Sequence, residues 1–148
     1  MSPLENPLLF RRAPRSLARR PLAEYARRLQ HAVAGGRAFL CLITDDRELR
    51  RLNRQFLRRD EPTDVLSFPE PGPDGFLGEM AISAGRAREQ ARALGHSLDE
   101  EIRILMLHGL LHLLGMNHAA DRGCMARAER RWRRKLGLPP GLIERARV

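Results

Sequence analysis

The stretch SLDEEIRILMLHGLLHLLG, residues 97–115, decides how the rest of the chain must fold. Ser97 and Glu100 have the spacing of a capping box, which predicts that a helix begins here. Gly115 is placed to end that helix. Between Ile104 and Leu114 the only polar side chains are two histidines, so apolar side chains occur on nearly all sides. We therefore expect this helix to run through the middle of the protein.

The chain on either side of this helix predicts a small sheet covered by helices. Apolar patterns predict strands at 37–44, 65–68 and 76–83 and helices at 15–34, from Thr44 as the cap, between Ser83 and Gly95, and at 121–136. In the second of these helices Leu49, Leu52 and Phe56 are expected to face inward. The residues after 140 are expected to form a loose tail. The 148 residues suit one domain, 1–148, of the α+β class, with a small central mixed sheet packed against helices.

Three histidines point to a metal site. His108 and His112 are four residues apart, so a helix places both rings on one face, one turn apart. Gly115 can turn the chain back, which allows His118 to reach the same point. Three imidazoles bind Zn²⁺ and leave a fourth position for water, as in catalytic zinc sites. The same donors also suit nickel, copper or iron, and Cys124 is a conceivable fourth ligand.

The spacing of these histidines equals that of the zincin-like metal helix of metzincin proteases. Those proteases have a glutamate directly after the first histidine as the general base, and this chain has Gly109. Peptide hydrolysis by the usual route would lack its proton acceptor, and Glu79 is the one candidate to replace it. A metal that lowers the pKa of bound water could instead attack a phosphodiester, whose charge metal and arginine can meet together.

The charge of the chain favours a polyanionic partner. The net charge is +9, and it is concentrated at the two ends: residues 1–40 hold eight arginines against two glutamates, and residues 119–148 hold nine basic against three acidic residues. Such ends attract RNA, with the arginines at 130–134 as the local candidate for phosphate contact. The alternative is an arginine-rich composition on solvated helix faces. With no membrane-spanning apolar run and two cysteines expected to be reduced, we expect a cytoplasmic protein that does not enter membranes.

Three segments together resemble the YbeY family of endoribonucleases, the ribosomal RNA maturation factors. They are HGLLHLLGMNH (108–118), RRDEPTDVLSFP (58–69) and LGEMAIS (77–83), in the order and spacing of that family. The resemblance implies that His108, His112 and His118 bind one zinc ion. It also implies metal-dependent cleavage of single-stranded RNA in 3′-end maturation of rRNA precursors of the small ribosomal subunit, and in ribosome quality control.

The chain departs from the family pattern near two of these motifs. Met116-Asn117 replaces a Tyr-Asp pair before the third histidine, so an acid/base role at position 117 is not expected. The family has a catalytic arginine after an aromatic residue, whereas here Phe56 is followed by Leu57. Arg59, with Arg58 behind it, is our candidate for that role, and a solvated helix end is the alternative.

Two hypotheses follow from the sequence. The leading one is a zinc-dependent endoribonuclease that acts on single-stranded RNA. The other is a non-catalytic ribosome-assembly factor with a structural metal, which would have no need of the arginine that Leu57 replaces.

Overall fold

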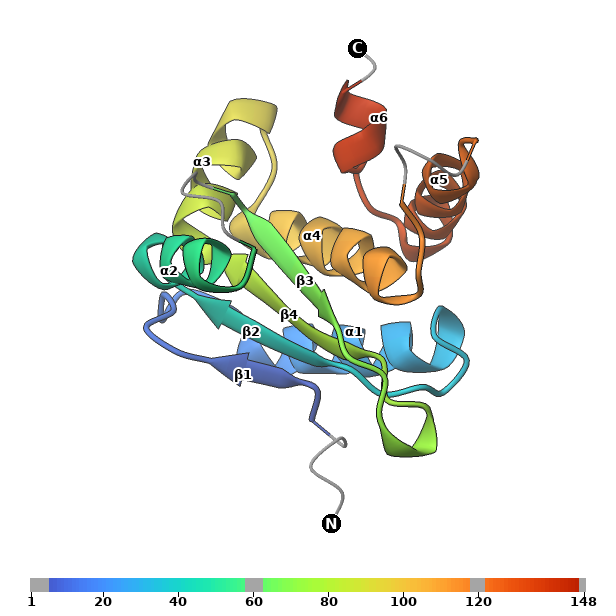
Figure 1. Cartoon of the computed structure of the whole chain (residues 1–148). Helices are drawn as coiled ribbons and strands as arrows, with labels where there is room; N and C mark the ends of the chain where they lie inside the picture. The colour runs from blue at the N-terminus through green and yellow to red at the C-terminus, as the bar shows by residue number, and fades with distance from the viewer. Residues whose placement is uncertain (1–5, 58–62, 118–121, 147–148) are drawn as a thin grey trace.

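A computed structural model describes residues 6–57, 63–117 and 122–146 (Figure 1). It has an α+β fold in which a mixed sheet packs against helices, as the sequence predicts. In chain order the elements are β1 (Leu8–Phe10), α1 (Arg19–Ala32), β2 (Leu40–Thr44), α2 (Asp46–Leu57), β3 (Val65–Pro69), a short 3-10 turn (Pro73–Gly75), β4 (Gly78–Ser83), α3 (Ala84–Leu94), α4 (Leu98–Leu113), α5 (Cys124–Leu136) and α6 (Leu142–Ala146).

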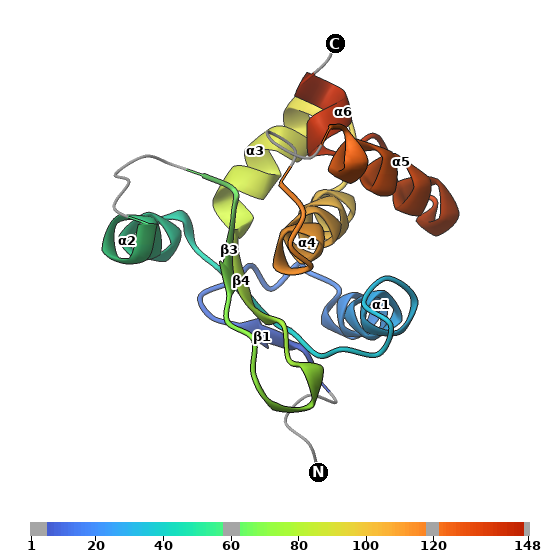
Figure 2. The same cartoon turned by 45° about the vertical axis from the view of Figure 1, so that its right-hand side comes forward.

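The sheet has four strands in the order β1-β2-β4-β3. The pairs β1–β2 and β2–β4 are parallel, and β3 runs antiparallel to β4 at the other edge. When the sheet is seen nearly edge-on, α2 lies on one side of it and α1 and α4 lie on the other (Figure 2). The sheet therefore has one well-covered face and one face covered only in part by α2.

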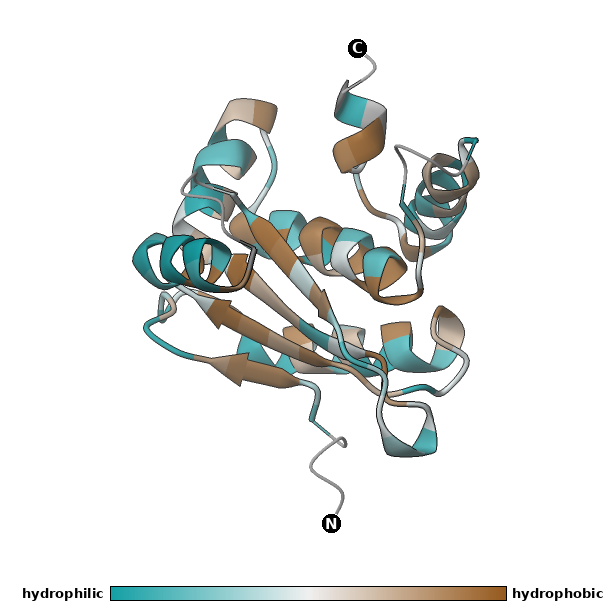
Figure 3. Ribbon diagram, viewed as in Figure 1, coloured by the Kyte–Doolittle hydropathy of each residue, from teal (hydrophilic) through white to brown (hydrophobic). Residues whose placement is uncertain are grey.

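Helix α4 is the centre of the core, as its sequence predicts. The capping box is present, because Ser97 Oγ accepts the backbone N–H of Glu100 at 3.1 Å and the Glu100 carboxylate accepts the N–H of Ser97 at 3.1 Å. Residues from Ile102 to Leu113 are buried except for Arg103 and His112, which are half-buried. The hydropathy colouring shows this apolar helix behind the brown strands of the sheet (Figure 3). The helix therefore places its histidines next to a dry interior.

Gly109 lets α4 pack closely against the sheet. A Cβ at Gly109 would lie 2.9 Å from Met80 Sδ and 3.3 Å from both Ser67 Oγ and Val65 Cγ2. Ser67 Oγ donates a hydrogen bond to the Gly109 carbonyl at 3.0 Å. The backbone of α4 thus approaches β3 and β4 at a distance that only glycine allows without displacing neighbours.

Three predictions about these elements are wrong. Asp45, not Thr44, caps α2: its Oδ1 accepts the Glu48 N–H at 2.9 Å, while Thr44 Oγ1 is buried with no partner among the described residues. Phe56 does not face inward; it is 58% exposed and packs edge-to-face on Phe68. The C-terminal tail is not loose, because Leu142–Ala146 form α6.

Candidate metal centre

The two helical histidines converge on one point. His108 is buried and His112 half-buried on the same face of α4, and their ring centroids are 4.8 Å apart. The Nε2 atoms face each other at 3.2 Å. The four-residue spacing therefore does what the sequence predicts, bringing both rings together.

Each ring is held by a hydrogen bond from its other nitrogen. His108 Nδ1 donates to Glu129 Oε2 of α5 at 2.8 Å, and His112 Nδ1 donates to the Met116 carbonyl at 3.0 Å. That carbonyl lies in the turn after α4, where Gly115 has a φ of +92°. With the proton on Nδ1, a neutral imidazole has a lone pair on Nε2. Two lone pairs that face each other do not form a hydrogen bond, but they suit a shared cation.

The distance between the two Nε2 atoms fits zinc. Tetrahedral ligands at about 2.0–2.1 Å from Zn²⁺ are separated by about 3.3 Å, close to the 3.2 Å observed between His108 and His112. The third predicted ligand, His118, lies outside the described residues. Within the described ranges, no three His, Cys, Asp or Glu side chains come close enough to hold an ion together. The residues present therefore fit two ligands of the expected centre, and the third stays a prediction.

Glu129 is the residue that the sequence reasoning missed. Its side chain is 1% exposed, and its second oxygen, Oε1, accepts the backbone N–H of Ile143 at 3.0 Å. A Cβ at Gly141 would overlap this carboxylate, so only glycine lets the chain pass there. Metal-binding histidines commonly donate their second N–H to a carboxylate in this way. The sequence did contain a signal for this residue. Glu129 is the one acidic residue of the arginine-rich helix α5, and it lies four residues after Met125, on the same side of the helix.

A second buried carboxylate ties α6 to α4. Arg145 binds Glu101 through two hydrogen bonds of 2.8 and 3.0 Å, and Glu101 is 0% exposed. His96 is also largely buried and contacts Glu101 at 2.7 Å. Glu101 and Arg145 thus hold α6 in place beside Glu129.

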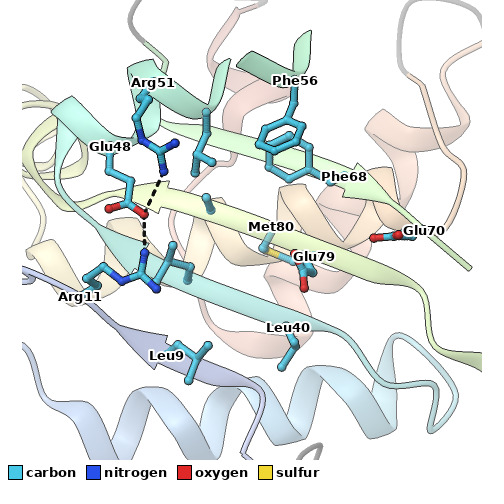
Figure 4. A pocket seen from close by; sticks show the side chains of 13 residues that line it. Leu9, Arg11, Leu40, Glu48, Arg51, Phe56, Phe68, Glu70, Glu79 and Met80 are labelled. Carbon is cyan, nitrogen blue, oxygen red and sulfur yellow. Dashed lines mark hydrogen bonds and ion pairs between the residues drawn. The ribbon is translucent and has the colours of Figure 1, made fainter. Parts of the chain in front are cut away.

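The position after the first histidine cannot act as it does in metzincins. Gly109 faces the sheet, where even a Cβ is 2.9 Å from Met80 Sδ, so a glutamate there would meet the strands. Glu79 cannot replace it, because Met80, its neighbour on β4, is the residue whose side chain packs against α4. Glu79 is exposed on the opposite face, where it lines a groove with Phe56 and Phe68 (Figure 4). A zinc peptidase would need a carboxylate on the side of the histidines, and neither position 109 nor Glu79 provides one there.

The structure describes only part of the segment RRDEPTDVLSFP (58–69). Arg58 and Arg59 lie outside the described residues, so their role stays a prediction. Thr63 Oγ1 donates to the Val65 carbonyl at 3.4 Å, which is a local turn contact. Ser67 is used to bind the α4 backbone. Thr63 and Ser67 therefore shape the backbone here, the commoner role for such residues.

The two cysteines are free thiols, as expected. Cys41 lies in the core, where burial raises the pKa of its thiol, so it stays protonated and is a poor metal ligand. Cys124 is exposed at the first turn of α5.

A four-stranded mixed sheet packed against a central helix, on which two histidines converge, places the chain in the α+β class of proteins. Comparison with known proteins identifies the group within that class. The family model "Endoribonuclease YbeY" matches residues 15–137, and the chain belongs to the YbeY endoribonuclease family.

Individual relatives agree with this assignment. A curated Endoribonuclease YbeY from Solibacter usitatus is 60% identical over 144 residues, which is 97% of each chain. One from Thermus thermophilus is 45% identical over 117 residues, covering 75% of this chain and 84% of its own. The solution structure of TM1509 from Thermotoga maritima has the same fold, with a TM-score of 0.57 at 24% identity over 84% of this chain and 86% of that one.

Proposed function

We propose that this chain is a single-domain, zinc-dependent endoribonuclease that cleaves single-stranded RNA during 3′-end maturation of small-subunit rRNA and in ribosome quality control in the cytoplasm. Membership of the YbeY family supports RNA cleavage. The facing Nε2 atoms of His108 and His112, 3.2 Å apart, are the structural observation that carries the metal-dependent part. In the described part of the chain no helix is both long and apolar enough to span a bilayer.

Each residue has a defined part in this proposal. His108, His112 and His118 hold the zinc ion, and Glu129 keeps the His108 ring oriented through its 2.8 Å hydrogen bond. When bound, zinc supplies a Lewis acid for the phosphodiester and lowers the pKa of water to near neutrality. Arg59, or Arg58 behind it, is proposed to bind the phosphate, since guanidinium groups pair with phosphate oxygens in two-point contacts.

The experiment is RNA cleavage by the purified zinc-loaded protein and by its His112→Ala variant. We expect the wild type to cleave a single-stranded RNA and the variant to lose activity while its circular dichroism spectrum is retained. Equal activity in the two proteins would remove the metal from the mechanism.

A non-catalytic ribosome-assembly factor with a structural metal is the second candidate, because Leu57 stands where the family has its arginine. Removal of zinc by a chelator separates the two functions. Loss of the fold indicates a structural metal, whereas loss of cleavage with the fold retained indicates a catalytic one.

A further inference from the structure

The outward face of α5 is a dense patch of positive charge. Five basic side chains line one shallow hollow along this helix: Arg127, Arg130, Arg131, Arg134 and Lys135. Their spacing of three and four residues places them on neighbouring turns of the same side. From Arg127 to Lys135 the patch extends about 12 Å along the helix at about 1.5 Å per residue. We call these five residues the α5 basic face.

The charge of the α5 basic face is not balanced by its own helix. Glu129 is the one acidic residue of α5, and it is buried against His108. Arg127 and Arg131, like Arg130 and Arg134, are like-charged pairs four residues apart, which weaken a helix. A face on which cationic side chains gather suits a polyanionic ligand.

Two cation–π contacts hold side chains of the α5 basic face in place. The Arg131 guanidinium lies 5.7 Å and the Lys135 Nζ 5.0 Å from the centre of the Trp132 ring. Trp132 is half-buried and packs against the core. The two cations are therefore held by a fixed aromatic ring, which reduces the entropy that they lose on binding a ligand.

We propose that the α5 basic face binds the phosphate backbone of single-stranded RNA. The same helix presents Glu129 to His108 on its inner side, so the proposed RNA surface and the carboxylate that orients a proposed zinc ligand are on opposite sides of α5. The inference rests on the proposed function, because it names where that substrate is gripped.

A second arginine-rich surface on α2 is a weaker candidate. Arg47, Arg50, Arg51 and Arg54 line it together with Asp46, and Arg51 lies 3.9 Å from Glu48. Carboxylates on α2 thus offset part of its charge. In Figure 2 α2 lies on the side of the sheet opposite α4, away from the histidines.

The test compares two matched double variants. Arg130→Gln/Arg134→Gln removes two exposed arginines four residues apart from α5, and Arg88→Gln/Arg92→Gln removes an equivalent exposed pair from α3. Binding of a fluorescein-labelled 12-nucleotide oligouridylate is measured by fluorescence anisotropy against potassium chloride concentration, with a chelator present so that no cleavage occurs. Melting temperatures check that both variants are folded.

We expect the α5 variant to bind about 10-fold more weakly at 100 mM salt and the slope of log affinity against log salt to fall by about 1.4, because each lost phosphate contact accounts for about 0.7. The α3 variant should change affinity by less than about twofold. Equal weakening by both variants, or none by the α5 variant, would overturn the inference. Because binding is measured without metal, a wild type that binds through α5 but does not cleave would instead contradict the proposed function.

Discussion

Replacing Glu129 with glutamine tests how the metal centre is supported. The carboxylate accepts two buried hydrogen bonds, from His108 Nδ1 at 2.8 Å and from the Ile143 N–H at 3.0 Å. Glutamine keeps the shape but has one acceptor oxygen, so its NH₂ group must face one of the two donors. A buried donor without its acceptor costs about 1–3 kcal/mol. Loss of the carboxylate partner of a metal-binding histidine typically lowers metal affinity about 10- to 100-fold, equivalent to about 1.4–2.8 kcal/mol.

The assay is competition for zinc between the protein and a chromogenic chelator, with thermal unfolding of the metal-free proteins alongside. Glu48→Gln is the matched control, because Glu48 of α2 is also a buried carboxylate and pairs with Arg11 and Arg12 instead of a histidine. Both variants should melt at lower temperature, and only Glu129→Gln should bind zinc more weakly. A folded Glu129→Gln variant with the zinc affinity of the wild type would show that Glu129 does not support the metal centre.

Three further perturbations test the packing and capping of α4. Gly109→Ala should destabilise the fold by about 1–3 kcal/mol in denaturant unfolding, because its Cβ would overpack against Met80; an unchanged midpoint would contradict the tight helix–sheet contact. Ser97→Ala should cost about 1 kcal/mol through loss of the N-cap, and no loss would mean that the capping box adds nothing. The hydrogen bond from the Ser97 backbone N–H is the main cause that lowers the pKa of Glu100 below its usual 4.5, so stability present above pH 4.5 should be lost as pH falls through the lowered pKa. Glu100→Gln should show a smaller fall of melting temperature in acid than the wild type, and an identical fall would contradict this assignment.

The parts of the fold that local rules determine were predictable from the sequence. The helix of residues 98–113 follows from its capping box and apolar composition, and α3 (Ala84–Leu94) is capped by Ser83 and by Gly95, which has a φ of +75°. The strands β2, β3 and β4 each contain enough apolar residues to be recognised. Their mixed pairing around a central helix is the α+β arrangement that we expected.

The parts that depend on distant partners were not predictable. Strand β1 has three residues and α6 has five, too few for a periodic pattern, and both are stabilised by contacts with remote segments. The sequence pattern places Phe56 on the inner side of α2, but its ring is 58% exposed and packs on Phe68 of the edge strand β3. Local patterns cannot tell how far a helix covers the sheet beneath it.

The candidate site was also predictable where it depends on one helix and not where it depends on the packing of several. The pairing of His108 with His112 is a property of one helix and was predictable from their spacing. The partner of His108 lies 21 residues away on α5, and its orientation depends on α6, which was expected to be a tail. Only the packing of three helices brings Glu129 to the histidine.

The most direct test of the central claim is the zinc content of the untagged protein beside its His108→Ala/His112→Ala/His118→Ala variant, measured by elemental analysis. We expect one zinc ion per wild-type chain and none in the variant, with the circular dichroism spectrum of the variant close to that of the wild type. Equal zinc in both proteins, or none in a wild type saturated with zinc and then desalted, would contradict it.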